Sequence, residues 1–110
     1  MTVSQIVDAL GWRVLAGAGQ LDNEINGGYV ADLLSCVMAG AEAGDLWITL
    51  QTHANIVAVA SLLGISAIVV AEGAPVLENT LTKAEEQGIP VLSTPEPVYR
   101  TVARLVDLGI

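Results

Sequence analysis

The chain has 110 residues, of which 53% are hydrophobic and only 4% aromatic, so it can form one domain with a core of valine, isoleucine, leucine and alanine. Its formal net charge of −8 comes from 12 acidic and 4 basic residues, and this balance argues against binding to nucleic acids or anionic membranes. The start of the chain lacks the basic and apolar regions of a signal peptide, and the longest apolar run, 56–63, is too short to span a bilayer. We therefore expect a soluble, cytoplasmic protein.

The first part of the chain predicts a helix up to residue 10, with Thr2 as its cap and Gly11 in a left-handed conformation at its end. A strand within 12–17 and a turn-rich stretch follow. Residues 29–44 predict the end of a strand and then a helix near 33–39. Cys36 lies in this apolar helix, so we expect a buried, inert thiol, and a single cysteine allows no intramolecular disulfide.

The second part alternates regularly between strands and helices. Strands are predicted over 46–50, 66–70 and 89–94, with a helix at 54–63 and others starting at Pro75 and Pro97. The inner face of the last helix is expected to contain Val98, Val102, Leu105 and Val106. Gly-Ile pairs at 64–65, 88–89 and 109–110 mark the helix ends. This alternation predicts one α/β domain over 1–110, with a mainly parallel sheet of four or five strands and helices on both faces.

Familiar catalytic and cofactor motifs are missing from the sequence. Gly17 and Gly19 begin like a dinucleotide-binding loop, but Asp22 stands where the third glycine belongs, so turn residues are the better interpretation. One histidine and one cysteine make a metal site improbable, and there is no Gly-x-Ser-x-Gly nucleophile motif. We therefore expect no catalytic residues, no metal and no cofactor.

The strongest candidate for a site is the polar cluster Gln51, Thr52, His53 and Asn55, between a predicted strand and the helix at 54–63. In open parallel sheets, ligands bind at the carboxyl ends of strands, and a helix start offers unpaired N–H groups to an anion. A small anionic or nucleotide-like ligand is therefore expected. In the alternative interpretation, Thr52 caps the helix, Asn55 braces the turn and His53 satisfies buried carbonyl groups.

Two neighbouring strand ends carry similar turns. Glu72 and Gly73 follow one strand, and Ser93 and Thr94 follow the other. These four residues are additional candidates, because they could face the same crevice.

Residues 31–73, "ADLLSCVMAGAEAGDLWITLQTHANIVAVASLLGISAIVVAEG", and residues 84–94, "AEEQGIPVLST", resemble the DRTGG domain family. The likeness extends over about 28–110. The Asp-Arg-Thr-Gly-Gly string that names the family is absent, so no binding residue is carried over from it. The resemblance implies a small α/β domain of regulatory or ligand-binding type, often dimeric, with no established activity. Relatives are fused to CBS domains or phosphotransacetylases or resemble the amino-terminal domain of HPr kinase, and standalone members occur near iron-hydrogenase genes.

Three functions follow from these observations. The favoured one is a non-catalytic regulatory or ligand-binding module. The alternatives are a protein-docking subunit associated with an iron-hydrogenase or similar redox system, and a small phosphotransfer or hydrolytic enzyme with His53 as general base. Helices 33–39 and 54–63 are apolar on nearly every face, and a domain this small can enclose only one such helix, so we also expect a twofold homodimer.

Overall fold

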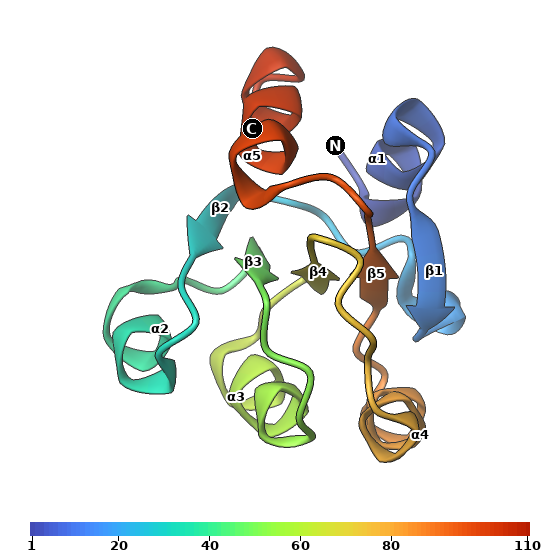
Figure 1. The fold of residues 1–110 in the computed structure, drawn as a ribbon, viewed down its shortest axis with the longest axis vertical. Helices are drawn as coiled ribbons and strands as arrows, with labels where there is room; N and C mark the ends of the chain where they lie inside the picture. The colour runs from blue at the N-terminus through green and yellow to red at the C-terminus, as the bar shows by residue number, and fades with distance from the viewer.

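Residues 1–110, all described by a computed structural model, build a five-stranded sheet between two layers of helices (Figure 1). The elements along the chain are α1 (Val3–Leu10), β1 (Arg13–Ala16), the short 3₁₀ helix η1 (Ala18–Gln20), β2 (Gly27–Val30), α2 (Leu34–Gly40), β3 (Asp45–Thr49), α3 (Asn55–Leu63), β4 (Ala67–Val70), α4 (Glu78–Gln87), β5 (Val91–Ser93) and α5 (Val98–Asp107). The strand order is β1-β5-β4-β3-β2. Strands β2 to β5 are parallel and β1 is antiparallel to β5, which confirms the predicted mainly parallel sheet.

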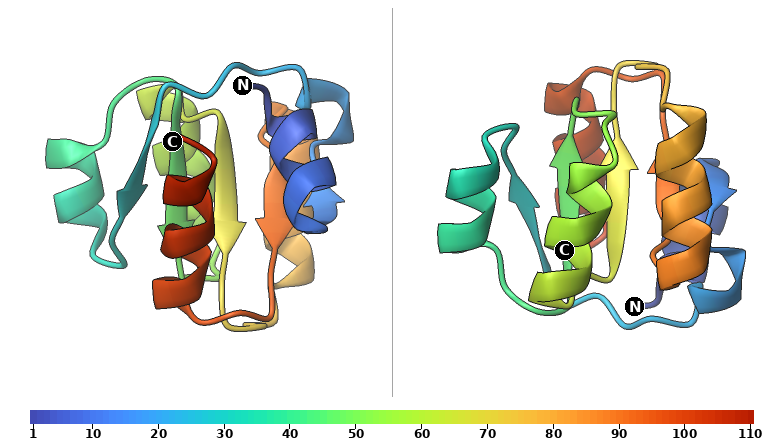
Figure 2. Two further views of the ribbon diagram at one scale, coloured as in Figure 1. Left: turned by 90° about the horizontal axis from the view of Figure 1, so that it is seen from above. Right: turned by 90° about the horizontal axis from the view of Figure 1, so that it is seen from below.

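The two faces of the sheet are covered unequally. Helices α2, α3 and α4 pack on one face, whereas α1 and α5 pack on the other (Figures 1 and 2). The connections from β2 to β3, from β3 to β4 and from β4 to β5 each contain one helix, and these three helices lie on the same face of the sheet (Figure 1). After β5 the chain crosses to the opposite face, where α5 lies (Figure 1). None of these helices combines the length and the apolarity needed to cross a bilayer.

The central strands β3 and β4 are buried in every residue, as expected for parallel strands covered on both faces. The expectation of a purely aliphatic core is wrong, because Trp47 of β3 is fully buried and is one of the largest core side chains. Its indole Nε1 donates a hydrogen bond of 2.9 Å to the carbonyl oxygen of Ala31. This bond satisfies the polar atom of a ring that otherwise contributes apolar surface.

The predicted ends of several helices are confirmed. The Thr2 side chain caps α1 in a reciprocal capping box with Gln5. Helices α1, α3 and α4 are followed by Gly11, Gly64 and Gly88, all left-handed. Gly17 lies in a turn, as predicted.

The predicted start of α4 at Pro75 is wrong. Leu77 has an extended backbone and precedes the helix, which begins at Glu78. The extended residue interrupts the helical hydrogen-bond pattern, and a glutamate in the first turn is favoured by the helix dipole. Val76 still packs against the core from the connection that leads into the helix.

Two expectations about burial are also wrong. Cys36 is exposed, because the short helix α2 lies beside the edge strand β2 and buries only Val37. Val106 is exposed as well, because the buried side of α5 runs through Thr101 and Leu105, one helical turn apart. Apolar character alone did not distinguish the inner side of these helices from the outer side.

Gly17 allows two segments to approach each other closely, and this leads to a testable prediction. Its φ is +76°, and an added Cβ would collide with the Ile89 carbonyl group and lie 2.5 Å from the Cα of Pro90. Gly11 has a similar φ of +70° with open space around it. We expect Gly11→Ala to cost about 1–2 kcal/mol for left-handed strain, and Gly17→Ala to cost roughly 2 kcal/mol more because backbone must shift.

Chemical denaturation of both variants measures this difference. Equal free energies of unfolding would contradict the close approach of Gly17 to the connection between α4 and β5.

Candidate functional site

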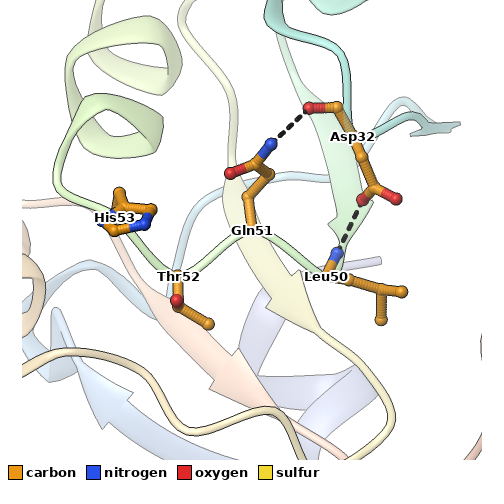
Figure 3. Close-up of a pocket in the computed structure, with 5 residues that line it drawn as sticks. All are labelled: Asp32, Leu50, Gln51, Thr52 and His53. Atoms are coloured by element: carbon orange, nitrogen blue, oxygen red, sulfur yellow. Dashed lines mark hydrogen bonds between the residues drawn. The ribbon is translucent and has the colours of Figure 1, made fainter.

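A polar cavity of about 320 Å³ opens at the carboxyl ends of β2 and β3 (Figure 3). Its lining residues are Asp32, Leu50, Gln51, Thr52 and His53. Four of these five residues belong to the segment between β3 and α3, and Asp32 comes from the segment between β2 and α2. The parallel pairing of β2 with β3 brings the two segments together.

The Asp32 carboxylate organises this end of the sheet. Its Oδ1 accepts hydrogen bonds of 2.8 Å from Thr49 Oγ1 and from the backbone N–H of Leu50. The Gln51 side-chain Nε2 donates to the Asp32 carbonyl oxygen at 2.8 Å (Figure 3). The second carboxylate oxygen, Oδ2, has no partner within the chain. The carboxylate therefore ties the two segments together and keeps one oxygen available as an acceptor.

A run of unpaired backbone donors lies beside this carboxylate. The N–H groups of residues 52–55 have no acceptor within the chain, and they lead into the first turn of α3. Such a helix start carries a partial positive charge and binds anions. A carboxylate acceptor, from Asp32, and the backbone donors of Thr52 and His53 thus belong to residues that line the same cavity.

The structure does not support the purely structural interpretation of Thr52 and His53. No side chain caps α3, whose N-cap residue is Ala54, so Thr52 is not the helix cap. His53 is exposed and its ring makes no hydrogen bond, so it does not satisfy a buried carbonyl group. Asn55 is the exposed first residue of α3 and does not line the cavity.

Helix α4 anchors residues 50–54, the segment between β3 and α3 that we call the site loop. Thr80 is completely buried, and its Oγ1 donates a hydrogen bond of 2.7 Å to the carbonyl oxygen of Thr52. This bond fixes the backbone from which the free N–H groups project.

The other four predicted residues lie at the same edge of the sheet but do not line the cavity. The backbone N–H of Gly73 donates to the Thr94 carbonyl oxygen at 3.0 Å, and that of Glu72 donates to the Glu96 carbonyl oxygen at 2.9 Å. The Thr94 hydroxyl group in turn accepts from the N–H of Glu96 at 3.2 Å. Ser93 is the last residue of β5 and pairs with its neighbours in the sheet. The loops after β4 and β5 are thus hydrogen-bonded to each other.

Asp32 was missed by the sequence analysis. The available signal was a carboxylate shortly after a strand end, in the stretch predicted as a strand leading into a helix. Placing the strand at Gly27–Val30 would have put Asp32 at the carboxyl edge next to Gln51. The structure contains no group of three or more histidine, cysteine or acidic residues arranged to hold a metal ion.

The hydrogen bond between α4 and the site loop predicts a specific loss of stability. Thr80→Val leaves the carbonyl group of the half-buried Thr52 without its partner, next to the buried side chain of residue 80, and we expect a cost of about 1–3 kcal/mol in the free energy of unfolding. Thr82→Val is the matched control, because Thr82 is exposed and bonds only to the Glu78 carbonyl oxygen of its own helix. We expect the control to change stability by less than about 0.5 kcal/mol. Similar losses for both variants in chemical denaturation would contradict the role assigned to Thr80.

Comparisons with known proteins agree with this architecture. A solved structure, described as the CBS and DRTGG domains of the regulatory region of Clostridium perfringens pyrophosphatase complexed with its activator diadenosine tetraphosphate, is similar with a TM-score of 0.73. The sequence identity is 21%, and the match covers 96% of this chain and 45% of the other, so this chain spans less than half of that structure's length. At this identity, the likeness shows a shared fold. No curated protein sequence matches the chain.

The family resemblance of the sequence is confirmed by a direct match. The model of the DRTGG domain matches residues 5–108, which is almost the whole chain. The chain therefore belongs to the DRTGG domain family.

Proposed function

We propose that this chain is a non-catalytic regulatory module that binds a nucleotide-like ligand in the cavity beside Asp32. One observation carries the proposal: at the carboxyl edge of a parallel sheet, one cavity is lined by Asp32, whose Oδ2 is unpaired, and by Thr52 and His53, whose backbone N–H groups are unpaired. A ligand that carries both a hydrogen-bond donor and a negative charge matches this pair of features.

Nucleotides have this combination of groups. A phosphate group can accept from the N–H groups of Thr52 and His53, and ribose hydroxyl groups can donate to Oδ2 of Asp32, because acidic residues accept from ribose in the same way in other parallel α/β sites. Inorganic phosphate would use only the backbone donors. It would gain no contact from a ribose hydroxyl group with Oδ2 of Asp32 to offset the repulsion by that carboxylate. A phosphate attached to a nucleoside is therefore the better ligand.

The similar pyrophosphatase region supports this ligand class. That protein segment is described as regulatory, and its activator, diadenosine tetraphosphate, is a nucleotide.

The surroundings of His53 favour binding over catalysis. A histidine that acts as general base is normally oriented by a hydrogen bond that its ring N–H donates to a second group. His53 has no such partner. No polar feature at the carboxyl edge of the sheet favours the alternative function, a protein-docking subunit, over ligand binding.

Calorimetric titration of the protein tests the proposal with four probes: diadenosine tetraphosphate, ATP, adenosine and inorganic phosphate. We expect the two nucleotides to bind more tightly than adenosine or phosphate. Asp32→Asn keeps one side-chain oxygen to accept from Thr49 and Leu50, but it replaces the free, charged oxygen Oδ2 by an uncharged amide group. Nucleotide affinity should therefore fall roughly 10-fold or more. Asp8→Asn, on the exposed side of α1, is the control and should leave affinity unchanged.

Three results would contradict this assignment. Absence of binding to all four probes would favour a protein-docking role. Unchanged nucleotide affinity in Asp32→Asn would place the site elsewhere. Nucleotide turnover that disappears in His53→Ala would establish an enzyme.

A further inference from the structure

The outer side of α5 exposes an apolar stripe. Tyr99 is 85% exposed and Val106 is 61% exposed, and Ala103 lies between them at helical spacing on the same side. We call Tyr99, Ala103 and Val106 the α5 stripe. A shallow, mainly apolar hollow covers it, which Val98, Val102 and Asp107 complete. Large apolar side chains exposed together in this way are typical of interaction surfaces.

The apolar surface continues from α5 to the edge of the sheet. A groove of about 150 Å³ separates α5 from β2 and shares Val102 and Val106 with the hollow above the stripe. Val30 of β2, 47% exposed, and Ile110 also line this groove. Strand β2 lies at the edge of the sheet and pairs only with β3, so no other strand of the chain covers its outer edge.

Unpaired charges of opposite sign flank the stripe. Arg100 and Asp107 are exposed, and neither makes an ion pair within the chain. They are seven residues apart, about two helical turns, and therefore lie on the same flank of α5. Arg104 on the same helix already pairs with Glu96 at 2.7 Å. Two of the four basic residues of this acidic chain thus lie on α5, which lowers the electrostatic repulsion between two copies that meet there.

We propose that the α5 stripe is a self-association surface on which α5 of a second copy packs antiparallel, with the twofold axis near Ala103. In this arrangement Tyr99 meets Val106 of the second copy, and the small Ala103 lets the two helices approach closely. A twofold axis perpendicular to both helices keeps the charged flanks on the same side. Arg100 then faces Asp107 of the second copy, and the reverse pair forms by symmetry.

The surface differs from the one suggested by sequence. Helix α3 buries four apolar residues against the sheet and its neighbours and exposes one large apolar side chain, Leu62, whereas α5 exposes Tyr99 and Val106 on the same side. The inference is independent of the proposed ligand, because the stripe contains none of the cavity residues.

Sedimentation and light scattering of the full chain at micromolar concentration test the proposal. We expect a mass of twice the 11.4 kDa chain. Val106→Glu places a charge in the interface twice and should raise the dimer Kd on the order of 100-fold. Leu62→Glu is the matched control, because Leu62 is 71% exposed on α3, in the layer on the other face of the sheet. It should leave the Kd unchanged, and circular dichroism should show both variants folded.

Charge reversal tests the antiparallel arrangement. Arg100→Asp and Asp107→Arg alone should each weaken the dimer roughly 5-fold to 10-fold, and the double variant should restore it. A wild-type chain that stays monomeric on concentrating would overturn the proposal. Dissociation by Leu62→Glu but not by Val106→Glu would overturn the choice of surface, and a double variant that remains weak would overturn the pairing of Arg100 with Asp107.

Discussion

Burial of β3 and β4 on both faces is the constraint on which the rest of the structure depends. Every residue of Asp45–Thr49 and Ala67–Val70 is buried, so the chain must supply a layer of helices to each side of these strands. Helices in the crossovers provide one layer, and because each crossover connects parallel strands, the carboxyl ends of β2 to β5 all reach the same edge of the sheet. Trp47 fills the three-helix side of the core, where its paired indole N–H replaces the hydrogen bond lost from water. The position of the candidate site is thus a consequence of how the core is covered.

The two halves of that edge differ in how their polar groups are used. After β4 and β5, the loops hydrogen-bond to each other, and the backbone groups of Gly73 and Thr94 are consumed in closing them. After β2 and β3, the Asp32 carboxylate joins the loops through a single oxygen, while its second oxygen and the N–H groups of 52–55 remain unpaired. Polar groups left without partners near a cavity are the ones that a ligand can satisfy at low cost, because their hydrogen bonds to water are easily exchanged. This difference explains why only part of the predicted cluster lines a cavity.

The unequal number of helices has a second consequence at β2. Two helices cover the face of α1 and α5, and the groove beside α5 leaves part of the edge strand open. Strand β2 therefore takes part in both features: Val30 lines the apolar groove, and Asp32, two residues further on, lines the polar cavity at the end of the strand. The arrangement follows from the end of the strand at Val30, which places Asp32 in the connection beyond the carboxyl end of β2.

The sequence by itself determined the alternation of strands and helices, the parallel sheet, the helix ends at Gly11, Gly64 and Gly88, and the polar segment at 51–53. These features are local, because they depend on apolar periodicity and on glycine's access to positive φ. Only the tertiary structure decided that Asp32 joins Gln51 across 19 residues, that Thr80 holds the site loop, and that Cys36 and Val106 face outward. A periodic pattern tells which side of a helix is apolar, but not how far its neighbours cover that side. A hydrogen bond between distant segments depends on strand order, which pairs β2 with β3 and is not written in either segment alone.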